Sequence, residues 1–236
     1  MQFHLYRLLR SLLFIGCLMP AAALHAGTNS TALQNDSDNA SDNLSDNPSD
    51  NAPYTVLIHG DSISAAYGMS LEQGWVALLE QTLAQEFPTL KMVNASISGE
   101  TTEGGLRRLP SLLEEHKPSL VVIELGGNDG LRGYPIKTLR NNLRELVHLS
   151  TNAGAQVILL PMEIPPNYGS RYTKAFRNSY SVVAQETQSY LGKFILEEIA
   201  LVDELMQDDG IHPTAQAQPQ IAAAVEAAIR DIKESM

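Results

Sequence analysis

The residue best suited to nucleophilic chemistry in this sequence is Ser62, in the run Gly60-Asp61-Ser62. The run directly follows an apolar stretch, residues 54–59, that is typical of a buried strand. A serine on a sharp turn that leaves a strand can point outward, with its own N–H close to a reacting carbonyl. Gly-Asp-Ser is also ordinary turn and helix-cap chemistry, so this run alone leaves both interpretations open.

A histidine that could act as the base for this serine is His212, three residues after Asp209 and directly before Pro213. On a loop, this spacing lets a carboxylate orient the imidazole and stabilise the imidazolium that forms when the histidine takes the serine proton. Asp208 could be the partner in place of Asp209. A single histidine before proline can also be a plain loop or helix-cap residue.

Two further positions could supply hydrogen-bond donors to a developing oxyanion. Gly99 follows the strand-like stretch 91–94, and a glycine there leaves its N–H free to donate. Asn128 follows the strand-like stretch 120–125 and two glycines, so its amide could be aimed at the same oxygen. A loop before a helix, or an Asn-Asp-Gly turn, would explain each of them without chemistry. Together with the serine and the Asp–His pair they form the set that acyl transfer requires.

The stretches that precede these residues indicate alternating strands and helices. We expect strands at 54–59, 91–94, 120–125, 156–160 and 194–196, and helices from Trp75 to before Pro88, around 106–113 with a break or start at Pro110, and at 135–152, 176–191 and 214–233. This alternation predicts one α/β domain over residues 54–236, with a parallel sheet between two layers of helices. Sites in such sheets lie at the carboxyl ends of the strands, which is where the candidate residues stand.

The first 26 residues have the pattern of a signal peptide. Arg7 and Arg10 precede an apolar stretch that is too short to cross a bilayer and is followed by small residues; an uncleaved anchoring helix is the alternative. Cys17, the single cysteine of the chain, stands in a weak lipoprotein-like context, but Phe14 is a poor fit at its position. We therefore expect a soluble periplasmic or secreted protein rather than one anchored at Cys17.

Residues 27–53 are rich in Asn, Asp and Ser, and the tripeptide Ser-Asp-Asn, first seen at Ser37, recurs at Ser41, Ser45 and Ser49. A segment with so few large apolar residues cannot bury enough surface to offset the conformational entropy lost on ordering. We therefore expect this segment to be a disordered linker. The formal charge of −11 argues against binding to nucleic acid or to anionic lipid. The sequence contains no Walker loop, Gly-x-Gly-x-x-Gly or His-Glu-x-x-His motif. We expect a monomeric protein.

Four blocks carry a resemblance to a known family: Gly60-Asp61-Ser62 and residues 94–110, 122–133 and 206–213. In this order they resemble the GDSL or SGNH hydrolase superfamily, and within it the bacterial enzymes with combined thioesterase, arylesterase and lysophospholipase activity. The resemblance covers about residues 54–223. It implies a three-layer, flavodoxin-like α/β/α fold and no metal or cofactor.

The resemblance also implies roles for individual residues. Ser62, Asp209 and His212 would form a triad, and the backbone N–H groups of Ser62 and Gly99 with the Asn128 side chain would form an oxyanion hole. Candidates for contact with the acyl group are Leu131, Pro135 and the loop from Ile164 to Tyr172.

The implied reaction is hydrolysis of aryl esters, acyl-CoA thioesters or lysophospholipids through an acyl-enzyme. Two alternatives stay open from the sequence. One is removal of O-acetyl groups from carbohydrate, which a polar and aromatic cleft would favour over an apolar groove. The other is a non-catalytic lipid-binding module, because a fold by itself does not prove activity.

Overall fold

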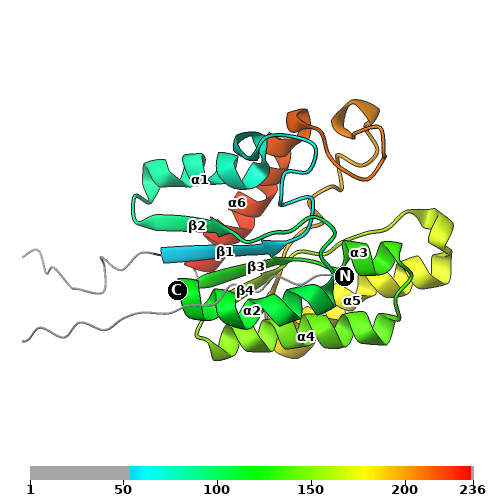
Figure 1. Ribbon diagram of the computed structural model, residues 1–236, viewed down its shortest axis with the longest axis horizontal. Helices are drawn as coiled ribbons and strands as arrows, with labels where there is room; N and C mark the ends of the chain where they lie inside the picture. The colour runs from blue at the N-terminus through cyan, green and yellow to red at the C-terminus, as the bar shows by residue number, and fades with distance from the viewer. Residues whose placement is uncertain (1–53, 235–236) are drawn as a thin grey trace, which may run out of the picture. The chain divides into compact units, whose positions relative to one another are not determined.

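The computed structural model describes residues 54–234, and the predicted signal peptide and linker lie outside the described residues. Five strands form one parallel sheet in the order β2-β1-β3-β4-β5 (Figure 1). The strands are β1 (Tyr54–Gly60), β2 (Leu90–Asn94), β3 (Leu120–Glu124), β4 (Gln156–Leu159) and β5 (Tyr190–Leu191). The helices are α1 (Trp75–Glu86), α2 (Thr102–His116), α3 (Gly127–Leu131), α4 (Ile136–Asn152), α5 (Ser170–Thr187) and α6 (Gln218–Glu234). Short 3-10 turns occupy η2 (Leu71–Gln73), η3 (Pro166–Tyr168), η4 (Asp203–Leu205) and η5 (Ala215–Ala217).

Helices cover both faces of the sheet. α1 and α6 lie on one face, and α2, α4 and α5 lie on the other (Figure 1). Every residue of β3 is buried, as is β1 after its first residue, which explains why these strands are nearly continuous in apolar residues. The predicted α/β/α fold with a parallel sheet is confirmed. Within residues 54–234, none of the helices is long and apolar enough to span a bilayer.

The helix expected to break or begin at Pro110 does neither. α2 begins at Thr102, where the Thr101 hydroxyl accepts a hydrogen bond from the Gly104 N–H, and it continues through Pro110 to His116. Proline removes one backbone hydrogen bond from a helix interior. Buried leucines on both sides of it, Leu109 and Leu113, hold this helix against the core.

The fifth strand was predicted at residues 194–196, and this was wrong. β5 is Tyr190–Leu191, which pairs with Ile158 and Leu159 of β4. Consequently, the preceding helix ends at Thr187 and not at 191. Ile195 and Leu196 are buried from an irregular segment, because a short apolar run can be buried without belonging to a strand.

His59, near the end of β1, is fully buried between the sheet and α2. Its Nε2–H donates to the Gly105 carbonyl oxygen at 3.1 Å. Among the described residues, its Nδ1 atom has no partner. Burial lowers the pKa of His59 to about 4, so the folded protein holds this imidazole neutral at physiological pH.

Replacing His59 with glutamine is expected to make the free energy of unfolding depend less on pH under acid conditions. Below pH 6.5 the unfolded chain protonates this histidine, whereas the folded chain does so only near pH 4. Between these pH values, the free energy of unfolding of the wild type should therefore fall by about 3 kcal/mol more than that of H59Q. Urea unfolding at stepped pH measures the difference, with the exposed His148→Gln as a control. Identical pH slopes for H59Q and the wild type would contradict the assignment.

Candidate active site

The candidate residues meet at the carboxyl edge of the sheet. Ser62 follows β1, Gly99 follows β2 and Asn128 follows β3, while His212 lies on the loop that leads to η5 and α6. The three strands are parallel neighbours, so the segments that leave them emerge side by side.

Ser62, His212 and Asp209 form a continuous hydrogen-bonded chain. The Ser62 Oγ–H donates to His212 Nε2 at 2.8 Å, and the His212 Nδ1–H donates to Asp209 Oδ2 at 2.6 Å. The structure thus places Asp209, and not Asp208, against the imidazole. Ser62 is 9% exposed and His212 is half-buried, so the pair is reached from one side.

Asp209 is held as a carboxylate. Its Oδ1 accepts the N–H groups of Ile211 and His212 at 2.9 and 3.0 Å. Partial desolvation acts to raise its pKa, but these bonds and the imidazole outweigh it and lower the pKa to about 2. The Tyr67 ring packs against the imidazole, with its centroid 4.3 Å from that of His212.

The turn that carries Ser62 is compact because Gly60 has no side chain. A Cβ at Gly60 would lie 2.6 Å from Glu124 Oε2 and 2.7 Å from Ser64 Oγ. The turn closes through hydrogen bonds from Ala65 N–H to the Asp61 carbonyl and from Tyr67 N–H to the Ser62 carbonyl. The sequence suggested a tight turn as the reason for this glycine, and the structure shows that the close approach of Glu124 is the stronger constraint.

The predicted oxyanion donors lie around the same serine. Gly99 has φ +79°, a left-handed conformation that glycine adopts without strain. Within the described part of the chain, the N–H groups of Ser62 and Gly99 have no protein acceptor. Asn128 lies in the first turn of α3, where its Nδ2 donates to Asp61 Oδ2 at 3.2 Å.

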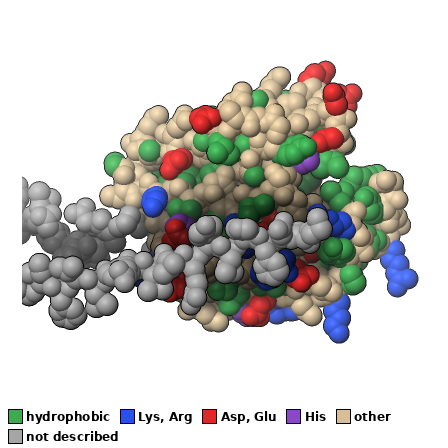
Figure 2. Space-filling view, in the orientation of Figure 1, with side chains coloured by type: hydrophobic (Ala, Val, Ile, Leu, Met, Phe, Trp, Pro, Cys, Tyr) green, Lys and Arg blue, Asp and Glu red, His purple; other side chains and the backbone are tan. Residues whose placement is uncertain are grey.

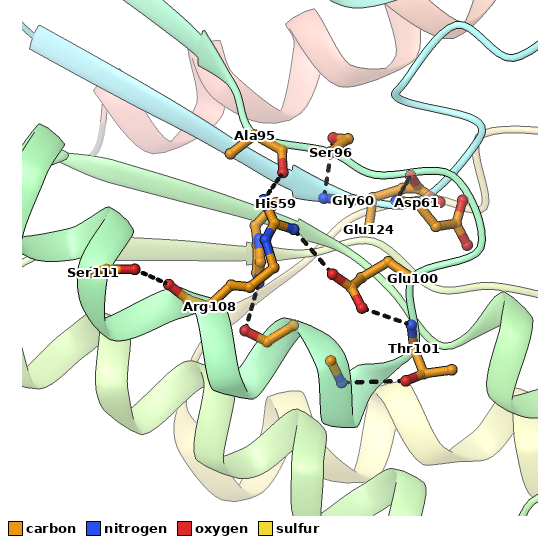
Figure 3. A network of polar contacts seen from close by, with 12 residues as sticks. His59, Gly60, Asp61, Ala95, Ser96, Glu100, Thr101, Arg108, Ser111 and Glu124 are labelled. Atoms are coloured by element: carbon orange, nitrogen blue, oxygen red, sulfur yellow. Dashed lines mark hydrogen bonds and ion pairs between the residues drawn. The ribbon is translucent and has the colours of Figure 1, made fainter. Parts of the chain in front are cut away.

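Two polar clamps fix the loop that carries Gly99. The Thr102 N–H and hydroxyl donate to the two oxygens of Asp129, at 2.9 and 2.5 Å, which ties the start of α2 to α3. Arg108 donates to the Ala95 carbonyl at 2.6 Å and to Glu100 at 3.0 Å (Figure 3). Both sides of the candidate oxyanion hole are therefore anchored to the same helix.

A cavity of about 520 Å³ opens beside Ser62, His212 and Asn128. Its wall is mainly apolar, and hydrophobic side chains gather at this end of the domain, on the right of the view in Figure 2. Its apolar lining includes Leu131, Met162, Ile164, Phe194, Leu196 and Met206.

Of the predicted acyl contacts, Leu131 and Ile164 line this cavity. Pro135 is not among its lining residues; it is exposed and precedes the first turn of α4. Tyr172, at the end of the predicted loop, lines a separate pocket and donates to the Tyr134 carbonyl. The segment after β5, which contributes Phe194 and Leu196, was not predicted to line the site.

Sequence reasoning also missed a buried carboxyl group directly behind Ser62. Glu124 is fully buried at the end of β3, and its Oε2 accepts the Ser64 hydroxyl at 2.6 Å and the Asp61 N–H at 3.2 Å. The sequence did contain an indication of this group. A glutamate inside a continuous apolar strand is expected to be buried, and a buried glutamate rarely lacks a partner. As for metals, residues 54–234 contain no group of three or more His, Cys, Asp or Glu side chains placed to hold an ion.

Comparison with known proteins gives the family. The model of the GDSL-like Lipase/Acylhydrolase family matches residues 58–218. Esterase TesA of Pseudomonas aeruginosa is 52% identical over 72% of this chain and 85% of its own, and Thioesterase 1/protease 1/lysophospholipase L1 of Escherichia coli K12 is 46% identical over 71% and 79%. The crystal structure of the esterase EstA from Pseudoalteromonas, inhibited by monoethylphosphonate, is 46% identical with a TM-score of 0.74, covering 76% of this chain and 98% of that one. The resemblance seen in the sequence is therefore confirmed: this chain belongs to the GDSL-like lipase/acylhydrolase family and is an ester-bond hydrolase.

Proposed function

We propose that this protein hydrolyses carboxylic esters and acyl thioesters through a covalent acyl-enzyme on Ser62. The observation that carries the proposal is the unbroken chain from Ser62 Oγ through the imidazole of His212 to the Asp209 carboxylate, at 2.8 and 2.6 Å. This is the geometry of a nucleophile with a base that a third group orients.

The proposed reaction has two half-reactions. The Ser62 oxygen attacks the acyl carbon while His212 Nε2 takes the serine proton, and the tetrahedral intermediate then expels the alkoxide or thiolate, which receives that proton from His212. A water molecule next attacks the acyl-enzyme with His212 again as base, which releases the acid and restores Ser62. The carboxylate of Asp209 stabilises the imidazolium in both halves.

The negative charge of each tetrahedral intermediate needs donors that are already in place. We assign this role to the N–H groups of Ser62 and Gly99 and to the Nδ2 of Asn128. The two backbone groups have no protein acceptor within residues 54–234, and so need not give up a bond to serve. Fixed donors of this kind act without reorganisation at the moment of reaction.

The cavity supports an acyl chain as the group bound beside Ser62. Its lining is mainly leucine, isoleucine, methionine and phenylalanine, which favours hydrocarbon over a carbohydrate ring. The relatives are named esterase, and thioesterase and lysophospholipase, which agrees with acyl substrates of both oxygen and sulfur leaving groups. The leader pattern of residues 1–26 supports action outside the cytoplasm.

Labelling with a fluorophosphonate tests the proposal directly. The probe should attach to one residue, and peptide mass analysis should find it on the peptide that contains Ser62. The rate of aryl ester hydrolysis should fall in proportion to the fraction of protein labelled. An inert, folded protein, or a label on another residue, would overturn the assignment of the nucleophile.

Narrowing the cavity is expected to shorten the preferred acyl chain. Ala200 lines the cavity, and its side chain is exposed. In A200W the indole should fill space that a long acyl chain would use, so kcat/KM for a decanoyl aryl ester should fall at least about tenfold, while the acetyl ester changes less than about threefold. Ala223→Trp, on the exposed surface of α6, is the matched control. Equal losses of kcat/KM for the two esters would show that the acyl chain binds elsewhere.

A further inference from the structure

Two buried carboxyl groups lie behind Ser62, and the proposed triad uses neither of them. Glu124 is 0% exposed and Asp61 is 2% exposed. Figure 3 shows them next to each other where β1 and β3 end. The burial of two adjacent acids requires an explanation, because charged carboxylates are costly to bury without partners.

The hydrogen bonds of Glu124 and Asp61 connect them to the turn that carries Ser62 and to the candidate oxyanion hole. Glu124 Oε2 accepts the Asp61 N–H and the Ser64 hydroxyl, which fixes the turn on both sides of Ser62. Asp61 Oδ1 accepts the Ile63 N–H at 3.1 Å, and Asp61 Oδ2 accepts Asn128 Nδ2 at 3.2 Å. Asp61 thus links the nucleophile turn to the amide assigned to the oxyanion hole.

Electrostatics assigns one proton to the pair. Burial raises the pKa of Asp61 to about 6, and burial together with the charge of Asp61 raises the pKa of Glu124 well above its usual range. Two adjacent buried carboxyls do not both ionise. Among the described residues, Glu124 Oε1 has no hydrogen-bond partner, which is a heavier penalty for an anion than for a neutral acid. Glu124 is therefore the neutral member and Asp61 the charged one.

The charge on Asp61 decides how the Asn128 amide must face. A carboxylate only accepts hydrogen bonds, so it can face the NH₂ of an asparagine but not its carbonyl oxygen. One N–H of Asn128 is held by Asp61, and the other remains for the substrate. The reversed amide would direct its carbonyl oxygen at the oxyanion and repel it.

We propose that Asp61, supported by a neutral Glu124, is the positioning group of the oxyanion hole, holding the Asn128 amide with its NH₂ toward the reacting carbonyl. This inference rests on the proposed function and adds a residue to it. Asp61 does not touch the reacting atoms and acts through Asn128.

The test is a double-mutant cycle between Asp61 and Asn128 with an aryl ester. Asparagine at position 61 matches the shape of aspartate but has one oxygen, so either the Ile63 N–H or the Asn128 NH₂ would face a new donor. D61N should lower kcat about 100-fold with KM within about threefold, similar to N128A, since both remove one oxyanion donor. The double variant D61N/N128A should fall within about threefold of N128A alone, because the residues act as a unit.

A merely structural role predicts a different result. If Asp61 only braced the turn, the losses in kcat would multiply in the double variant, and that outcome, or full activity of folded D61N, would overturn the proposal. Thermal unfolding of each variant checks that the fold is intact.

Variants of Glu124 test its protonation state. In E124Q an amide replaces the neutral acid and keeps an oxygen for the Asp61 N–H and the Ser64 hydroxyl, whereas E124A removes both bonds. E124Q should recover most of the kcat that E124A loses. A folded E124Q as inactive as E124A would show that Glu124 must be charged; should E124A not fold, the cycle at Asp61 and Asn128 still decides.

These outcomes are separable from failure of the proposed function. An active S62A variant would overturn the acyl-enzyme itself. An inactive S62A variant together with fully active D61N would leave the acyl-enzyme in place and remove only the role of Asp61.

Discussion

Replacing Ser62 with alanine is expected to lower kcat for an aryl ester by about five to six orders of magnitude, leaving only the rate supported by binding and oxyanion contacts. Ser62 Oγ is the hydroxyl that lies 2.8 Å from His212 Nε2, so no other serine can take the proton-transfer role without moving the turn. Initial rates at saturating substrate, corrected for spontaneous hydrolysis, measure the effect.

The exposed Ser70→Ala, at the start of η2, is the matched control and should keep wild-type rates. S62A should also lose fluorophosphonate labelling while its unfolding temperature stays close to that of the wild type. More than about 1% residual activity in S62A would be incompatible with a nucleophilic Ser62, because the loss would then be far smaller than nucleophile removal produces.

Replacing Asp209 with asparagine should lower kcat by about three to four orders of magnitude. The amide cannot neutralise the imidazolium, and its NH₂ can face His212 Nδ1, which favours the tautomer that carries its proton on Nε2 and cannot accept the serine proton. The pKa of Asp209, lowered to about 2, means that the carboxylate is ionised across any practical assay range. D209N should therefore be defective at every pH between about 5 and 9.

Asp208 provides the matched control, since it is the adjacent carboxylate and the sequence alone left both open. D208N should keep kcat within about twofold, because the bonds to His212 come from Asp209. A greater loss in D208N than in D209N would reverse the assignment of the orienting residue.

The strand ends were predictable because they depend on local pattern. Residues 120–125 are continuously apolar, and a parallel sheet brings all its carboxyl ends to one edge. The sequence alone therefore predicts that Ser62, Gly99 and Asn128 lie together. Their proposed roles came from the family resemblance as well as from this placement, and the experiments above test those roles.

Short or irregular segments were less predictable. The run 194–196 has the apolarity of a strand, but β5 forms four residues earlier, and Phe194 and Leu196 line the cavity from a loop. Pro135 was expected near the acyl group and instead lies outside the cavity lining, at the start of α4. Apolarity predicts burial, but it does not say which surface a loop residue faces.

What the sequence by itself determined was the alternation of strands and helices, the edge at which the site lies and the presence of a serine with a histidine and carboxylates to serve it. These follow from periodicity and from the geometry common to all parallel sheets. The tertiary structure alone decided that Asp209 and not Asp208 meets His212, and that Glu124 and Asp61 are buried together behind Ser62. Both depend on distances between residues far apart in the chain, or on the conformation of one loop, and local patterns of residue type do not specify either.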